Sequence, residues 1–154
     1  MVQESIATLA KALGRAIAAD TNAFKAALEE YLTLRSSVQR LLDEDDYKYM
    51  AFQLWQEGVS MYIEYRMADL AATSYEPTAA FRALPDYRPF GEIANAVLGN
   101  VLETLPELDL GEMKRVGFYY LGAGEALLLD RANPGWLQNY FPAMFSLDDF
   151  WQKE

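Results

Sequence analysis

The chain has 154 residues and a mass of 17.4 kDa, which suffices for one domain of ordinary size. Hydrophobic residues make up 52% and charged residues 23%, so the sequence can form an apolar core and does not belong to a disordered class. The net charge of -10 would repel a nucleic-acid backbone, so DNA and RNA are not expected partners. The lack of His and Cys excludes disulfides, thiolate zinc sites and nucleophiles activated by histidine.

No apolar run approaches the roughly 20 residues that span a bilayer, and residues 1–5 lack the pattern of a secretory signal. We therefore expect a soluble chain with no membrane partner. The sequence leaves its cellular compartment open, because the absence of cysteine is common both inside and outside cells.

The first half of the chain is patterned for long helices, since all six prolines lie at or after Pro77. Apolar residues spaced by three and four predict a helix over about 3–19, a second over 24–42 and a third over 47–72. The acidic run 43–46 fits the start of the third helix, because a helix dipole favours carboxylates there. Gly58 lies inside that helix at a cost of about 1 kcal/mol relative to alanine. We therefore expect a close backbone neighbour or a bend at Gly58.

The second half alternates loops and shorter helices. Residues 73–89 combine three prolines with aromatic side chains, which predicts an ordered loop over the core. Pro89 suits the first turn of a helix that Pro106 ends, and another helix is predicted from about Asp109 to Leu128. Asn133 and Pro134 indicate a further helix start, and residues 146–149 a final short turn. The predicted fold is therefore all-α, one domain over 1–154, with five to seven helices around the central helix 47–72.

The stretch from Leu54 to Tyr65 is the most informative part of the sequence. It places Trp55 shortly before the pair Glu57-Gly58, and Tyr62 shortly after it. This resembles the helix of gluzincin metallopeptidases, a class that includes the zinc aminopeptidases, in which the glutamate before the glycine is the third protein ligand of zinc. The resemblance implies that Glu57 is a latent zinc ligand, and a glycine at 58 would let this helix pack close to a neighbour.

A second element follows in the order expected of that class. Tyr119-Tyr120-Leu121-Gly122 is similar to a Y-x-x-G element whose tyrosine stabilises the oxyanion, which implies that role for Tyr119. Residues 122–131, with Pro134 and Trp136, resemble the tail of bacterial metallopeptidase-like proteins. The likeness extends from about Tyr47 to Phe150.

The chain departs from the family at the zinc site itself. Gluzincins bind zinc through the two histidines of H-E-x-x-H, and this sequence contains no histidine. One carboxylate cannot hold a catalytic zinc, which takes three protein ligands. We therefore expect no cofactor in this chain alone, and zinc only if histidines come from elsewhere, such as a missing N-terminal segment. The leading hypothesis is a catalytically incomplete metallopeptidase-like domain, a fragment or an inactive relative, and not an enzyme as it stands.

The alternative is a stand-alone helical module that binds a protein, a peptide or a second copy of itself. On that interpretation Glu57 is a structural carboxylate paired with Arg35, Arg66 or Lys48, and glycines 122 and 124 serve close helix packing. The two hypotheses differ in the surroundings of Glu57. A fragment would expose an apolar patch around it, whereas a binding module would pair it internally and bind elsewhere.

Overall fold

The computed structural model describes residues 2–151, and within them it contains helices and no strand, which confirms the all-α prediction. Six α-helices have ten or more residues, in line with the five to seven expected, and two more have four residues each. The α-helices are α1 (Val2–Ala18), α2 (Phe24–Leu41), α3 (Glu44–Gln53), α4 (Val59–Ser74), α5 (Ala79–Arg82), α6 (Phe90–Thr104), α7 (Leu110–Met113) and α8 (Gly117–Ala132). A π-helical turn, η1 (Leu54–Gly58), joins α3 to α4, and the 3-10 turns are η2 (Leu105–Glu107), η3 (Lys114–Val116), η4 (Trp136–Asn139) and η5 (Asp148–Trp151).

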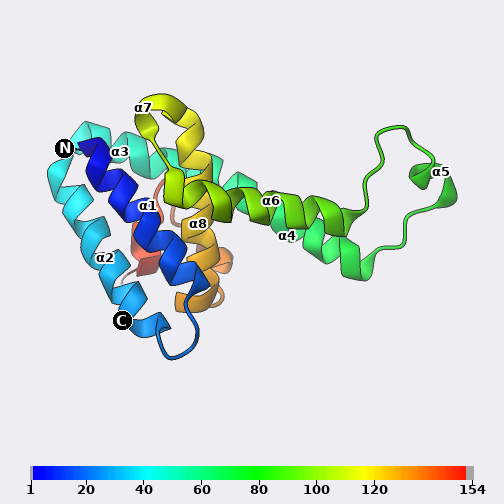
Figure 1. Ribbon diagram of the computed structural model, residues 1–154, viewed down its shortest axis with the longest axis horizontal. Coiled ribbons are helices and arrows are strands. Elements are labelled where there is room, and N and C mark those ends of the chain that lie inside the picture. Colours follow the sequence, from blue (N-terminus) through cyan, green and yellow to red (C-terminus); the bar gives the residue numbers. More distant parts are fainter. Residues whose placement is uncertain (1, 152–154) are drawn as a thin grey trace.

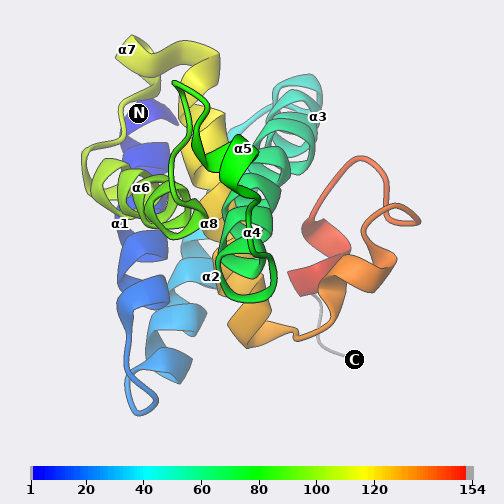
Figure 2. The same ribbon diagram turned by 90° about the vertical axis from the view of Figure 1, so that its right-hand side faces the viewer.

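The described chain forms a helical body from which a two-helix arm extends (Figure 1). Helices α1, α2, α3 and α8 and the C-terminal turns belong to the body, whereas α4 and α6 run side by side along the arm and α5 lies at its tip. Figure 2 looks at the arm from its tip and shows the C-terminal turns on the side of the body away from α1. The arm therefore leaves much of α4 and α6 outside the body.

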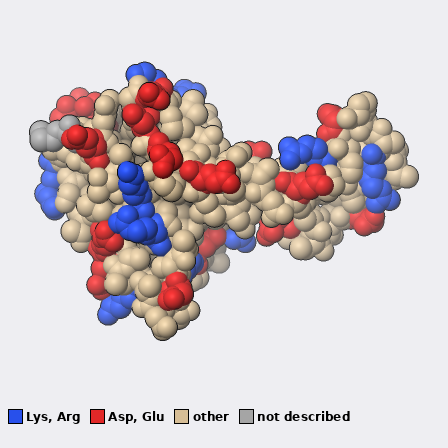
Figure 3. Space-filling model, in the orientation of Figure 1, with Lys and Arg blue, Asp and Glu red and all other residues tan. Residues whose placement is uncertain are grey.

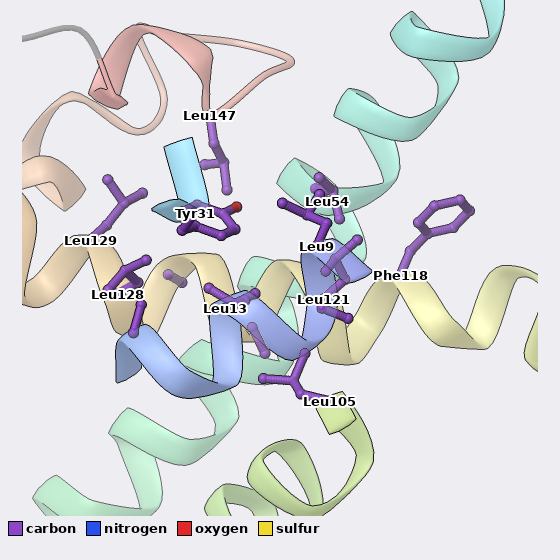
Figure 4. Packing of buried hydrophobic residues seen from close by; sticks show 14 of the residues in the cluster. Leu9, Leu13, Tyr31, Leu54, Leu105, Phe118, Leu121, Leu128, Leu129 and Leu147 are labelled. Atoms are coloured by element: carbon purple, nitrogen blue, oxygen red, sulfur yellow. The ribbon is translucent and has the colours of Figure 1, made fainter. Parts of the chain in front are cut away.

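The core of the body forms around α8, which is buried along most of its length, and not around the predicted central helix 47–72, whose α4 part runs along the arm (Figure 1). The apolar stripe of α1, including Leu9 and Leu13, faces α8, and Leu105 of η2 fills the space between the two (Figure 4). Leu121 and Leu128 of α8 are fully buried there. Burial of such side chains contributes about 1.5–3 kcal/mol each, so this contact stabilises the body more than any surface ion pair does.

The predicted helix 47–72 is present as α3, η1 and α4. Asp43 caps the start of α3 by accepting a hydrogen bond from the Asp46 backbone N–H at 2.9 Å, which confirms the acidic run as a helix start. Gly58 has the close backbone neighbour expected there. It ends a π turn in which the Val59 N–H bonds to the Leu54 carbonyl, and it lies against the backbone of Gly122 in α8.

This glycine contact permits a close crossing of η1 and α8. A Cβ added at Gly58 would lie 2.6 Å from the Gly122 carbonyl carbon, and one added at Gly122 would lie 2.6 Å from the Leu54 carbonyl oxygen. Real side chains do not approach a backbone that closely, so both positions require glycine for steric reasons. The contact also confirms close packing at Gly122.

The prediction that residues 73–89 cover the core is wrong. Because α4 continues to Ser74, past the edge of the body, it takes this segment to the tip of the arm (Figure 1). The aromatic side chains that suggested a core contact pack on one another instead. Phe81 lies 5.7 Å from Tyr87 and 6.2 Å from Phe90, and Tyr75 lies 6.0 Å from Phe90, as measured between ring centroids.

Two predicted helix boundaries in the second half differ from the structure. The helix expected from Asp109 is divided, because Lys114 adopts a positive φ of 53° between α7 and α8. Asn133 does not start a helix but ends α8, with its N–H bonded to the Leu129 carbonyl. Its side chain also donates to the Phe150 carbonyl at 3.1 Å, which ties the final turn to the end of α8.

Gly58→Ala should lower the free energy of unfolding by about 1–3 kcal/mol or more, because the new methyl group would overlap the Gly122 backbone. Gly99→Ala is the matched control. A Cβ there meets nothing within 4 Å, and alanine in a helix should stabilise by about 0.5–1 kcal/mol. Chemical denaturation followed by circular dichroism measures both. If the Gly58→Ala protein were as stable as the parent, this would contradict the close backbone contact between Gly58 and Gly122.

Candidate functional site

The structure places Glu57 in the π turn beside the glycine crossing. Its side chain is 17% exposed, and one carboxylate oxygen lies 3.4 Å from the Arg115 guanidinium. Arg115 comes from η3, directly before α8. Glu57 is thus already paired with a cation of this chain.

Tyr119, the second residue that the resemblance singled out, lies next to Glu57. A hydrogen bond to Glu57 is the main reason that the pKa of the Tyr119 hydroxyl is raised, with smaller contributions from burial and from the negative charge of Glu57. The two residues are far apart in the sequence, and they meet because Gly58 and Gly122 bring η1 and α8 into backbone contact. The structure therefore brings the two predicted site residues together.

The partner expected for Glu57 was wrong. Arg35, Arg66 and Lys48 bind other carboxylates, at Glu125, Asp130 and Glu44 respectively. The sequence reasoning missed Arg115 because the pairing depends on the break between α7 and α8, which turns η3 toward the π turn. The Lys114 backbone conformation that makes this break has no sequence signature.

The residues around Glu57 do not fit a zinc ion by themselves. Among residues 2–151 no group of three or more acidic side chains is placed to hold a metal. A guanidinium within ion-pair distance of Glu57 would also repel a cation. The Glu57 and Tyr119 pair is therefore incomplete as a metal site on the side chains that the described chain supplies.

A buried polar network that the sequence analysis did not anticipate crosses the body between α2, α8 and η5. Glu125 of α8 is fully buried and accepts hydrogen bonds from the Tyr31 hydroxyl and, at 2.9 Å, from Arg35 Nε. Arg35 also donates to Asp148 at 2.8 Å. Burial, together with the nearby charge of Glu125, raises the pKa of Tyr31 well above its ordinary value. The available signal was that Glu125 is the one charged residue in the stretch 117–129 of α8.

A second polar cluster holds the base of the arm against the end of α8. Asp130 accepts hydrogen bonds from the Tyr62 hydroxyl at 2.8 Å, from Arg66 at 2.8 Å and from the Trp136 indole at 3.1 Å. The adjacent Arg131 is not part of this cluster. Arg131 instead donates to the Ile17 carbonyl at 2.8 Å, because the two side chains leave α8 on different sides.

Apolar side chains on the arm are exposed in a regular pattern. Ile63, Met67 and Leu70 of α4 are 39%, 61% and 57% exposed, and their spacing of four and three places them on one helical face. The opposite side of α4 faces α6, where Ala72 lies against Gly91. We call the exposed row Ile63, Met67 and Leu70 the arm stripe.

Comparison with known proteins gives no relative: no family model, no curated protein and no solved structure matches this chain. Within residues 2–151, no helix has the length and apolar character that crossing a membrane requires. Function must therefore be argued from the geometry of the chain itself.

Glu125→Leu should lower the free energy of unfolding by about 3–5 kcal/mol, because it leaves the Arg35 guanidinium buried without its main carboxylate. Glu30→Leu removes one partner of an ion pair between half-exposed side chains, and should change stability by at most about 1 kcal/mol. Urea unfolding of the two variants provides the comparison. Similar losses in both would show that removing Glu125 leaves no costly unpaired charge in the body.

Proposed function

We propose that this protein is a helical interaction module that self-associates through the arm stripe. The observation that supports this is the row of three exposed apolar side chains on a helix that projects away from the body. An apolar row on a projecting helix is typical of surfaces that another helix covers. Glu57, in contrast, is paired within the chain, as the hypothesis of a binding module requires.

The exposed area supports a second copy as the partner. The chain exposes 9139 Å², whereas a compact monomer of its mass exposes about 7,850 Å². The excess of roughly 1,300 Å² is larger than the about 800 Å² that each partner contributes to a standard interface. Pairing two arms would cover apolar surface that a single chain leaves in water.

The arrangement of charges also suits an antiparallel pair of α4 helices. If Met67 of each copy faces Leu70 of the other, the two stripes cover each other. Arg66 and Asp69 lie on the same side of the stripe, so Arg66 of each copy, which already binds Asp130 of its own chain, would also come near Asp69 of the other copy. Acidic and basic side chains both gather at the tip of the arm (Figure 3), so the arm is not uniformly repulsive despite the net charge of -10.

Met67→Glu should weaken self-association at least 30-fold, roughly the 2 kcal/mol expected of a central interface residue, because it buries a charge in the paired stripes. Val116→Glu is the control. Val116 is similarly exposed, at 54%, but it belongs to the body next to α8. Sedimentation equilibrium over a protein concentration series measures both. A parent chain that stays at 17.4 kDa at every concentration would overturn the proposal.

Salt should strengthen the dimer. Two copies with a net charge of -10 repel each other, and raising the ionic strength screens that repulsion while leaving apolar contacts intact. The dissociation constant from the same sedimentation series should therefore fall between 0.05 M and 0.5 M NaCl. A dissociation constant that rises with salt would indicate an association held by opposite charges instead of the stripe.

The metallopeptidase-like interpretation is the second candidate, and the proximity of Tyr119 to Glu57 favours it. The sequence resemblance points to each of these residues independently of their contact. The chain would then be the part of such a protein that follows H-E-x-x-H, with Glu57 as a relic zinc ligand.

Native mass spectrometry with added zinc tests this second candidate, with Glu57→Gln as the variant. Because the described residues do not form a zinc site alone, we expect no stoichiometric zinc in either protein. Zinc that binds the parent chain and is lost in Glu57→Gln would show a metal site assembled between copies. That result would make peptidase activity the next measurement.

A further inference from the structure

We propose that a hollow between α3 and the C-terminal turns binds a cation with an apolar body, such as an arylalkyl or aliphatic ammonium ion. The hollow has a volume of about 460 Å³ and is lined by Ala51, Phe52, Met144, Phe145, Tyr47, Lys48, Ser146 and Asp148. This size and a mainly apolar wall with few polar groups are characteristic of small-molecule sites. The hollow is separate from the arm stripe and from Glu57.

The walls are aromatic and held in place. Phe52 and Phe145 pack edge to face, with ring centroids 5.8 Å apart, and both rings contact Trp55. Trp55 in turn stacks on Tyr140, at 4.9 Å. Aromatic faces attract cations electrostatically in addition to offering apolar contact. These rings therefore suit a ligand that is both apolar and positively charged.

The polar side of the hollow is negative. Asp148 lies there, and although burial opposes its charged form, Arg35 and the hydrogen bonds from Tyr47, Arg35 and Ser146 hold the pKa of its carboxyl below the ordinary value. Asp148 is therefore ionised at neutral pH. Arg35 cannot neutralise it fully, because the same guanidinium is bound to buried Glu125. Two carboxyl groups thus share one positive charge.

The Asp148 carboxylate keeps acceptor capacity for a ligand. Arg35 and the Tyr47 hydroxyl both donate to the same oxygen, Oδ1, at 2.8 and 2.7 Å. A carboxylate offers about four lone-pair sites, so an ammonium group could donate to the capacity that remains and would offset the excess negative charge. Lys48, the other charged residue of the lining, is bound to Glu44 at 2.6 Å and does not reach Asp148.

The test compares three small probes with the same aromatic ring: 2-phenylethylammonium, 2-phenylethanol and phenylacetate. Titrations of the full chain at pH 7, followed by NMR chemical shifts, give the three dissociation constants. We expect the ammonium to bind at least tenfold more tightly than the alcohol, and phenylacetate to bind weakest. Shifts should be largest for the amides near Phe52 and Phe145.

Three variants localise the effect. Asp148→Asn should remove the preference for the ammonium over the alcohol, whereas Asp149→Asn, a change at the exposed neighbour, should leave it within twofold. Phe52→Ala should weaken the binding of the ammonium and of the alcohol by similar factors, because it removes one aromatic wall of the hollow. Phe52 does not line the second hollow that Asp148 borders, so this variant also distinguishes the two hollows.

Measurements on the parent chain can already overturn the proposal. They do so if the three probes bind with equal affinity, or if phenylacetate binds more tightly than the ammonium. Shifts confined to the second hollow, next to Leu32 and Gln39, would also overturn it. If Asp148→Asn does not fold, Lys48→Met gives the complementary test. Losing that positive charge from the lining should strengthen ammonium binding about two- to threefold, and an unchanged or weaker affinity would contradict the electrostatic account.

Discussion

The contact between Gly58 and Gly122 is the constraint on which the rest of the structure depends. Two backbones approach there to a distance that no other residue type allows. The contact fixes η1 against α8, and so sets the direction in which α4 leaves the body. The arm, the exposed stripe and the meeting of Glu57 with Tyr119 all follow from that direction.

Two polar clusters hold the segments on either side of this contact. Asp130 binds Tyr62 and Arg66 at the base of the arm, so α4 is anchored where it leaves α8. Arg35 joins Glu125 in α8 to Asp148 in the C-terminal turn, which closes the body over its core. Burying charges costs free energy unless every group is paired, so these clusters specify which segments meet more than they add stability.

The sequence predicted those features of the fold that depend on local residue patterns. Apolar spacing located the segments that form the six longer helices, although α3 and α4 were predicted as one helix; Asp43 marked the start of α3, and Gly58 indicated a close neighbour. It failed where distant segments decide the outcome. The aromatic residues of 73–89 resemble core residues in sequence, and only the length of α4 beyond the body explains why they pack together at the tip. The partners of Glu57 and Asp130 likewise depend on tertiary contacts that sequence spacing does not encode.

The central claim is that the arm joins two copies, and distance measurement between spin labels tests it most directly. The chain has no cysteine, so single labels at Thr73→Cys and Val116→Cys are unambiguous. In an antiparallel pair of α4 helices, label 73 of one copy should lie about 20 Å from label 73 of the other, given 1.5 Å per residue and helices about 10 Å apart. The Val116 labels, on the two bodies, should lie much farther apart. A short distance between the Val116 labels, or no intermolecular signal at Thr73, would contradict the account.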